Sequence, residues 1–491
     1  MAEPVRTDVL VIGSGPGGAV TGLLCAEARR SVLMIEDGPD LPVDSAPPFS
    51  LQEIAQKYRG GGIGVAFGPA KLAYVEGRCV GGGSEVNRGL YHRAPASLLD
   101  RWHRDFQVRD LSPEVMAAHF EACEAIARVE YLPGEAPGIS TRLRDGAEAL
   151  GWAAVEARRL YCYGGESAGK QSMSRTFVPR FRAAGGELRA GLRAVRLARS
   201  GNGWQVEAVQ QADGQASRPV SIRADTVFVA CGAVQTPALL RRSGMRRNIG
   251  SSLRFHPMLK MVAEFPEEVN KPGDLDPVHQ VKQFEPDVGM GCSVSTPSTL
   301  ALALNADAEA QARIASCWRR MGMYYVQSTG GQAKVRNLPF FRDPLVTFQF
   351  DRADRARLVQ GLKDLGRALF AAGAVRVYPA VAGCPAVTSQ RELDDLSDAI
   401  VRQEGSLSSV HVFSSCPMGE DEERCATDSY GRVRGAEGLH IADASLLCTP
   451  TSVNPQGTVM AIARRNVLHL LDAGVGRGHR AQPSRVRELV E

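Results

Sequence analysis

The chain has no long apolar segment and no strong excess of charge of either sign. No window approaches the roughly 18 consecutive apolar residues that a transmembrane helix needs. The 58 Lys and Arg residues and 54 Asp and Glu residues leave a formal net charge of only +4, scattered along the chain. A nucleic-acid-binding stripe or a membrane-seeking basic helix would gather basic residues in one place. The sequence therefore predicts no nucleic-acid partner and no membrane partner.

Paired cysteines and metal-binding spacings are also lacking. The eleven cysteines are dispersed, with no CxxC pair and no His/Cys pattern of the kind that holds zinc. Several, such as Cys25 and Cys231, lie in apolar runs and are expected to be small buried side chains. The first predicted strand begins within eight residues of Met1, so we expect no signal peptide. An odd number of cysteines without a secretion signal indicates reduced thiols and a cytoplasmic protein.

The size and composition are typical of a large globular enzyme. The 491 residues are enough for two domains, each with its own core. The hydrophobic fraction is 44% and the charged fraction is 23%, and both values are ordinary for a folded protein.

A glycine-rich turn near the N-terminus lies between two predicted strands. A short apolar run leads into Gly13-Ser-Gly15-Pro-Gly-Gly18, a helical pattern follows, and a second strand-like run ends at Glu36. A dinucleotide-binding motif needs this context. We expect Gly13 to form the tight turn, Gly15 to let the backbone approach a pyrophosphate, and Gly18 to let helix and strand pack closely. Glu36 is expected to accept hydrogen bonds from the adenosine ribose. The motif fits FAD or NAD, and a turn without a ligand is the alternative.

A second informative region near the C-terminus combines a histidine with an asparagine. The stretch His411-Val-Phe-Ser-Ser-Cys-Pro-Met-Gly419 is followed by Asn454-Pro-Gln-Gly-Thr458 and then by apolar residues at helical spacing. Asn is a preferred N-cap, and Pro is favoured at the first helical position, so a helix is predicted to start at Asn454. Its N-terminus would present unpaired N–H groups, which suit developing negative charge. An ordinary capped helix is the alternative.

Two further glycine-rich segments complete a family pattern. One is Gly77-Arg-Cys-Val-Gly-Gly-Gly-Ser-Glu-Val-Asn87, and the other is Gly232-Ala-Val-Gln-Thr-Pro-Ala-Leu-Leu-Arg-Arg-Ser-Gly-Met245 after a strand-like run. Together with the N-terminal turn and the two C-terminal segments, in this order, they make the chain resemble the glucose-methanol-choline (GMC) oxidoreductases. The resemblance reaches from residue 8 to about residue 471, and only 101–180 and 259–400 match loosely.

The resemblance implies a fold of the α/β class, with a Rossmann-like FAD-binding domain and an α+β substrate domain whose mainly antiparallel sheet is backed by helices. The expected pieces of the FAD-binding domain are 1–100, 181–258 and 403–475; those of the substrate domain are 101–180 and 259–402; and 476–491 is expected to be a flexible tail. Within these pieces we expect helices over much of 99–151, with a start at Ser112-Pro-Glu, and a helix over 355–372.

The resemblance also implies residues that hold FAD. The ADP half is assigned Gly13, Gly15, Gly18 and Glu36. The pyrophosphate and flavin side is assigned Arg78, Gly82, Gly83, Ser84 and Asn87. Val195 would meet the adenine through its backbone, Asp443 and Ala444 would approach the pyrophosphate or the ribityl chain, and Asn454 and Pro455 would begin the helix that faces the flavin.

For the chemistry, His411 is the candidate base and Asn454 the candidate partner. An alcohol donates hydride poorly until its hydroxyl proton is being removed, and a histidine has a pKa near working pH. Asn454 can orient the substrate oxygen but cannot act as a base. The alternative is a structural histidine. His92 is expected to have a packing or hydrogen-bonding role, and His256 a structural role.

Two positions depart from the family pattern. The family usually has glycine where Ser414 stands, so the local turn is expected to differ. Some relatives attach FAD covalently through a histidine in the glycine-rich loop, where this chain has Val86. We therefore predict non-covalent FAD.

The substrate is predicted least well. The sequences of segments 365–373 and 446–454 resemble those of bacterial family members that act on sugars. These members include enzymes that oxidise the primary 6′-hydroxyl of aminoglycoside intermediates. Other polyols, aliphatic alcohols and sterols are the alternatives. A flavin-binding protein without alcohol-oxidising activity and an NAD-dependent dehydrogenase also stay open, as do the electron acceptor (oxygen or another) and the oligomeric state.

Overall fold

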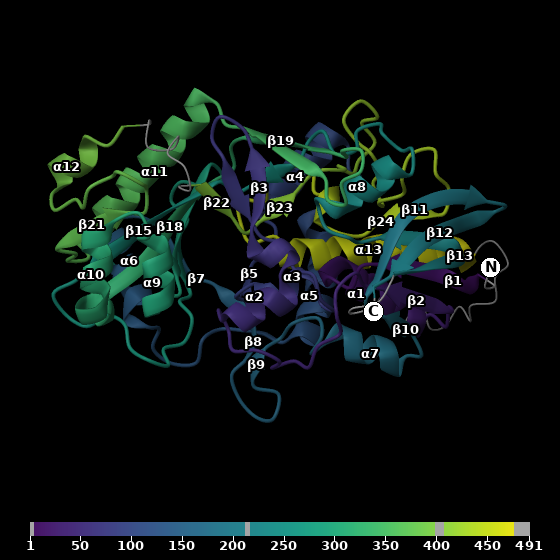
Figure 1. The fold of residues 1–491 in the computed structure, drawn as a ribbon, viewed down its shortest axis with the longest axis horizontal. Helices are drawn as coiled ribbons and strands as arrows, with labels where there is room; N and C mark the ends of the chain where they lie inside the picture. Colours follow the sequence, from purple (N-terminus) through teal and green to yellow (C-terminus); the bar gives the residue numbers. More distant parts are fainter. Residues whose placement is uncertain (1–3, 212–216, 398–406, 476–491) are drawn as a thin grey trace.

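The computed structural model describes residues 4–211, 217–397 and 407–475. The expected tail 476–491 lies outside the described residues, as does the start of the piece 403–475. Figure 1 shows two sheet regions beside one another: the N-terminal strands at the right, and the strands and helices of the middle of the chain at the left.

A seven-stranded sheet contains the N-terminal strand at its centre. Its order is β10 (Glu187–Arg189), β2 (Val32–Ile35), β1 (Val5–Ile12), β13 (Arg218–Val229), β12 (Gly203–Gln210) and β11 (Leu192–Ser200), with β24 (Leu439–Ile441) beside β13. β1 pairs in parallel with β2 and β13, whereas β11, β12 and β13 form an antiparallel ribbon. The last four residues of β1 are buried, as expected for a parallel strand with both faces covered.

Two helices that are far apart in the sequence cover one face of this sheet. They are α1 (Pro16–Glu27) and α13 (Gln456–Val475), and they share an apolar core with β1 and with α7 (Phe177–Ala183). Figure 1 shows the yellow α13 next to the purple α1, and the two helices pack against one another.

An eleven-stranded sheet forms the other region. Its order is β19 (Gln332–Arg336), β20 (Leu345–Gln349), β3 (Gly64–Phe67), β4 (Leu72–Tyr74), β22 (Leu407–Ser409), β15 (Met258–Glu264), β18 (Met321–Ser328), β17 (Val288–Ser293), β16 (His279–Val281) and β7 (Ala154–Glu156), with β21 (Arg376–Pro379) beside β15. Most of its pairs are antiparallel. α6 (Gly138–Ala149) and α11 (Arg352–Ala371) pack on one face. On the other face α9 (Pro297–Ala303) and α10 (Ala308–Cys317) cover only one end.

The fold class predicted from the sequence is confirmed, and the sheets also show how the expected pieces interleave. β3 and β4 come from 1–100 and β22 comes from 403–475, yet all three pair within the large sheet. The division into two domains stays a prediction.

The predicted helices are present, and the predicted start at Ser112-Pro-Glu is confirmed. α4 (Ala96–Phe106), α5 (Pro113–Ala127) and α6 fill the segment expected to be helical, and the Ser112 hydroxyl caps α5 at the Val115 N–H. α11 begins at Arg352 rather than Arg355, because the Asp351 carboxylate accepts from the Asp354 N–H and forms the N-cap.

The start of α13 corrects one prediction. The helix begins at Gln456, and the Pro455 carbonyl accepts the first helical hydrogen bond from the Val459 N–H at 3.0 Å. Asn454 therefore is not the N-cap, and its side chain contacts His411 and Gln280 instead.

Further elements connect these regions. They are α2 (Leu51–Lys57), α3 (Gly83–Val86), α8 (Gln235–Arg242), α12 (Gln390–Asp394), β5 (Leu90–Tyr91), β6 (Val129–Glu130), β8 (Arg158–Cys162), β9 (Gly169–Lys170), β14 (Arg254–Phe255) and β23 (Val412–Phe413). The short antiparallel pairing of β14 with β23 sets Phe255 opposite Val412. It therefore brings the residue after β14, His256, next to the residue before β23, His411.

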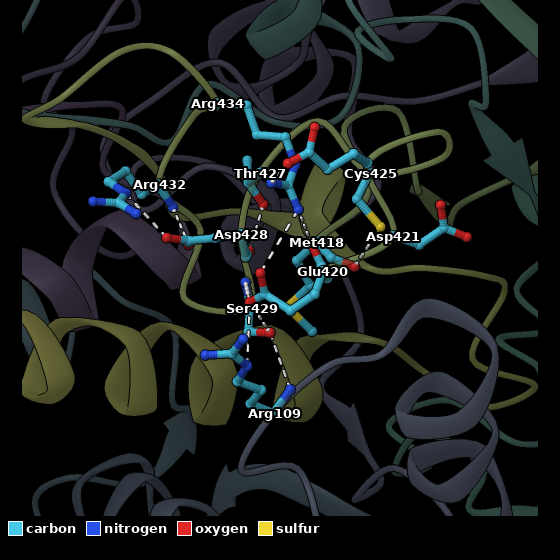
Figure 2. A network of polar contacts seen from close by, with 12 residues as sticks. Arg109, Met418, Glu420, Asp421, Cys425, Thr427, Asp428, Ser429, Arg432 and Arg434 are labelled. Atoms are coloured by element: carbon cyan, nitrogen blue, oxygen red, sulfur yellow. Dashed lines mark hydrogen bonds and ion pairs between the residues drawn. The ribbon is translucent and has the colours of Figure 1, made fainter.

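The loop between β23 and β24 is held by a polar network (Figure 2). Glu420 accepts from both the N–H and the hydroxyl of Ser429, at 3.1 and 2.7 Å, and the same hydroxyl accepts from the Arg109 N–H at 3.0 Å. Arg434 donates to the Gly419 carbonyl at 2.6 Å. This network closes the loop on itself and on the segment before α5, so the two strands at its ends keep fixed positions.

Candidate active site

A cavity of about 510 Å³ is lined by residues of both sheets. At one end it is lined by the glycine-rich turn after β1, and at the other by His411, Asn454 and residues of the large sheet. The predicted site residues that line it are Gly13, Gly15, Glu36, Gly82, Gly83, Asn87, His411, Asp443, Ala444, Asn454 and Pro455.

The turn after β1 has the glycine roles expected from the motif. Gly13 has φ +107°, and a Cβ there would lie 2.2 Å from the Ala230 carbonyl oxygen. A Cβ on Gly18 would lie 2.0 Å from the Gly13 carbonyl oxygen, so helix and strand approach too closely for any side chain. A Cβ on Gly15, by contrast, would point into open space. Gly15 therefore leaves room for a ligand, whereas the other two are required by packing.

The second glycine-rich loop faces that opening. Gly82 has φ +54°, and its Cβ position is 2.9 Å from the Cα of Gly15, so the two backbones touch. A Cβ on Gly83 would meet nothing. Gly15 and Gly83 thus expose bare backbone to the cavity beside the N-terminus of α1. Bare backbone at a helix N-terminus suits a pyrophosphate. The residues present fit the diphosphate of FAD.

The Glu36 carboxylate is hydrogen-bonded to residues of its own loop. Its carboxylate accepts from the Ser14 N–H and hydroxyl at 3.0 and 2.7 Å and from the Gly38 N–H at 3.0 Å. Burial raises the pKa of Glu36, and these donors oppose that shift. Oε2 accepts both bonds from Ser14, so only Oε1 keeps a further lone pair, and the expected bond to a ribose hydroxyl stays a prediction.

Four residues assigned to FAD contacts do not line the cavity: Gly18, which is required by packing, and Arg78, Ser84 and Val195. Arg78 turns to Asp37 and Gln211, and the Ser84 hydroxyl accepts from the Met173 N–H and donates to the Gly81 carbonyl. Val195 lies at a β-bulge of β11, and its carbonyl accepts from Arg242 at 3.3 Å. These residues instead hold the loops that face the cavity. In β11 it is Leu192, Arg193 and Ala194 that line it.

Asp443 lines the cavity and joins two segments of the chain. Its carboxylate accepts from the Gly232 N–H at 2.8 Å, the Thr236 hydroxyl at 2.5 Å and the Ser445 N–H at 2.8 Å. Burial raises the pKa of this carboxyl group. The bonds hold the turn before α8 against the segment after β24, where Ala444 faces the cavity.

His411 and Asn454 are in contact at the other end. The Asn454 amide nitrogen lies 3.2 Å from His411 Nε2, and His411 Nδ1 lies 2.9 Å from His256 Nδ1. Because an amide nitrogen can only donate, Nε2 of His411 is an acceptor and its proton is on Nδ1, which donates to His256. His411 therefore presents an unprotonated Nε2 beside Asn454. Burial lowers the pKa of His411 to about 4, so the ring is neutral at pH 7.

The network continues into the large sheet. Gln280 donates to the Asn454 oxygen at 3.4 Å and to the Tyr325 hydroxyl at 3.0 Å, and its own oxygen lies 2.8 Å from His92 Nε2. Burial lowers the pKa of His92 to about 3. The expected hydrogen-bonding role of His92 is confirmed, and Gln280 and Tyr325 are site residues that the sequence did not indicate.

His256 is more than the structural residue that was predicted. It is fully buried, and its pKa is lowered well below the usual value by burial and by the neighbouring His411. Its position follows from the β14–β23 pairing. The only signal in the sequence was its place in the segment Arg254-Phe-His-Pro257, which matched the family.

The two departures from the family pattern have different outcomes. Ser414 has φ +65°, a left-handed conformation that glycine adopts more readily than serine, and the expected difference from the family's turn stays a prediction. Its hydroxyl is buried without a partner among the described residues. Val86 lines the cavity and carries no group that could bond to a flavin. The free cysteines include Cys25, which is buried, and Cys231, which is half-buried and lines the cavity.

Membrane-spanning helices and metal clusters are absent from residues 4–211, 217–397 and 407–475. No helix in the described part of the chain is long and apolar enough to cross a membrane. Over the same ranges, no group of three or more His, Cys, Asp or Glu side chains is arranged to hold a metal ion.

Comparison with known proteins gives a consistent result. A family model described as GMC oxidoreductase matches residues 11–258 with its N-terminal part and 339–463 with its C-terminal part. An uncharacterised GMC-type oxidoreductase of Sinorhizobium fredii is 38% identical over 474 residues, which cover 94% of each chain. A long-chain-alcohol oxidase of Arabidopsis thaliana is 27% identical, over 94% of this chain and 67% of its own. The structure of pyridoxine 4-oxidase from Mesorbium loti superposes with a TM-score of 0.72 at 18% identity, covering 96% of this chain and 100% of that one.

Proposed function

The chain belongs to the GMC oxidoreductase family and is an FAD-dependent alcohol oxidoreductase, and from this premise we propose that His411 is the base and Asn454 the group that orients the alcohol. The observation that carries the proposal is the contact of the two side chains at the cavity wall, with the unprotonated Nε2 of His411 beside the Asn454 amide. FAD, when bound, supplies the acceptor for the hydride that leaves the carbinol carbon.

The tautomer of His411 determines the path of the hydroxyl proton. Nε2 of His411 accepts the hydroxyl proton as the α-hydrogen leaves, and the resulting imidazolium keeps its Nδ1–H bond to His256. His256 is buried and has its pKa held low, so it stays an acceptor while His411 is charged. Asn454 donates to the same oxygen that loses the proton. Gln280 fixes the orientation of the Asn454 amide from behind.

At the cofactor-binding end of the cavity, exposed backbone and the N-terminus of a helix would bind FAD. We assign the diphosphate to Gly13, Gly15, Gly82 and Gly83, the ribose to Glu36, and the ribityl and flavin side to Asn87, Asp443, Ala444 and Pro455. The Asn87 amide donates to the Gln456 side chain at 2.5 Å, which ties the glycine-rich loop to the first residue of α13. The N-terminus of this 20-residue helix faces the cavity, and its N–H groups would stabilise negative charge there.

The test is anaerobic bleaching of the flavin spectrum against a panel of alcohols. Wild type should bleach with at least one class, and readmitted air then separates an oxidase from a dehydrogenase. His411→Ala should keep its flavin and lose about 100- to 10,000-fold in the rate of bleaching. His103→Ala removes an exposed histidine and is the matched control. Full turnover by His411→Ala would refute the assignment of the base.

The substrate proposal is narrower and depends on the charge of the cavity. A sugar-like alcohol is compatible with the polar groups of Gln327 and Tyr325, but a cationic aminoglycoside would need free carboxylates. Asp276 lines the cavity, and it is held by Arg88 at 2.7 Å and by Arg159 at 2.5 Å. The 6′-hydroxyl of an aminoglycoside stays a prediction, and this pairing favours the other alcohols.

A further inference from the structure

One lysine lies on the floor of the substrate end of the cavity. The register of the large sheet places Gln280, Gly291, Tyr325 and Lys260 in one transverse row across β16, β17, β18 and β15. Side chains of one such row point to the same face of a sheet. Lys260, Tyr325, Met258 and Gln327 all line the cavity, so Lys260 points into it from a floor whose other side chains are neutral.

The neighbouring side chains are already engaged. Gly291 stands opposite Tyr325, and a Cβ there would lie 2.4 Å from the Tyr325 oxygen, so the tyrosine lies across β17. Its hydroxyl accepts from Gln280, which in turn holds Asn454. Tyr325 therefore turns toward the reacting end and away from Lys260.

The ammonium group of Lys260 has no hydrogen bond or ion pair to any residue that the structure describes, whereas its backbone carbonyl accepts from the Ala380 N–H. Burial lowers the pKa of its ammonium group, and no neighbouring charge opposes this shift. Asp276 is a carboxylate that lines the same cavity, but two arginines already bind it. A buried ammonium group without a counter-charge is unfavourable, and an anion beside it would offset that cost.

We propose that the alcohol substrate carries a carboxylate, and that Lys260 binds this group while His411 and Asn454 hold the hydroxyl. This deepens the proposed function and rests on it. Lys260 lies two residues beyond Met258 on the same face of β15, about 7 Å further along the strand. His256, which holds His411, lies just before β15. The carboxylate and the hydroxyl are therefore separated by several bonds, as in a hydroxyalkanoate rather than an α-hydroxy acid.

The experiment compares alcohols that differ only in the charge of the far end. A series of ω-hydroxyalkanoates of increasing chain length is titrated anaerobically into the holoenzyme, with the diol and the amino alcohol of each length. Flavin bleaching reports the reaction, and the alkanoate that lacks the hydroxyl reports binding through its perturbation of the flavin spectrum. At the best chain length the carboxylate should half-saturate at about 10- to 100-fold lower concentration than the diol, and the amino alcohol should bind more weakly than the diol.

Variants at Lys260 test whether this residue causes the preference for the carboxylate. Lys260→Met, of similar length and without charge, should bind the carboxylate and the diol equally while FAD stays bound. Lys260→Arg should keep the preference, and Lys260→Glu should reverse it toward the amino alcohol. Lys334→Met, on an exposed position of β19, changes the net charge equally and should keep the preference.

Three results would overturn the inference while leaving the proposed function intact. They are equal saturation by all three alcohols in wild type, a carboxylate preference that survives in Lys260→Met, and an effect of Lys260→Met confined to reoxidation by air. If no alcohol of any class bleaches the wild-type flavin, the proposed function fails and this inference fails with it.

Discussion

Buried neutral histidines should make this protein less stable as the pH falls from 7 to 5. Burial lowers the pKa of His92 to about 3 and that of His440 to about 4, whereas a histidine in an unfolded chain titrates near 6.5. Between these values the unfolded chain binds a proton that the folded protein does not bind. The free energy of unfolding therefore decreases as the pH falls below about 6.5, and the decrease levels off below the folded pKa.

The magnitude follows from the same two pKa values. At pH 5 each site contributes about 2 kcal/mol less to the free energy of unfolding than at pH 7, because one pKa unit corresponds to about 1.4 kcal/mol. His92→Gln and His440→Gln remove the titrating ring. Each should shrink the difference between the unfolding free energies at pH 7 and pH 5 by about 2 kcal/mol, whatever its effect at pH 7 alone. The two sites lie in different parts of the fold, since His92 contacts Gln280 and His440 packs on Phe228.

The assay is urea unfolding followed by circular dichroism at both pH values, with FAD in excess. His103→Gln, which replaces an exposed histidine, should behave as wild type. If both His92→Gln and His440→Gln lost as much stability on acidification as wild type does, the reasoning from burial would be refuted.

Three further predictions concern the site. His256→Phe should retain FAD but slow flavin reduction about 10- to 100-fold, because nothing then holds His411 in its tautomer. His256→Gln, which keeps a hydrogen-bond acceptor, should recover part of the rate. Equal rates in wild type and His256→Phe would contradict this prediction. Ser414→Gly should raise the free energy of unfolding by about 0.5–1 kcal/mol, because serine is strained at φ +65°, and a lower urea midpoint would contradict it. Denaturation should release all of the flavin into solution, because Val86 cannot form a bond to it, and yellow colour retained on the polypeptide would show that FAD is covalently attached.

The nucleotide end of the site could be predicted because its constraints are local. Gly13 and Gly18 are required by backbone contacts within one strand–turn–helix unit, and the glycine spacing records those contacts directly. The opening at Gly15 follows from the same turn. A pattern of this kind is visible in the sequence because few other residues can satisfy it.

The catalytic end could be predicted only in part. His411 and Asn454 were found through the family pattern, but His256 lies 155 residues away from His411 and meets it through the β14–β23 register. No periodicity in the sequence reports such a pairing. The position of Lys260 depends in the same way on the register of four strands.

The direction of the polar groups explains three of the residues that were assigned to FAD but do not line the cavity. Arg78 and Ser84 through their side chains, and Val195 through its backbone carbonyl, bond to a neighbouring segment instead of facing inward. The sequence locates a loop, and the packing around that loop decides which of its groups face a ligand. The start of α13 shifted for a related reason, because Asn454 contacts His411 and not the helix backbone.

The central strand of the smaller sheet has a consequence for how this protein is made. β1 pairs on one side with β13, and β13 pairs with β24, which ends at residue 441. On one face of this sheet, α1 packs against α13, the last helix of the described chain. A nascent chain therefore cannot finish its nucleotide-binding half until β24 and α13 have been synthesised. Contacts over such sequence separations form slowly, and incomplete chains expose apolar surface that favours aggregation. Cofactor capture should thus be a late, post-translational event, and heterologous yield should respond to chaperones and to growth temperature more than to flavin supply.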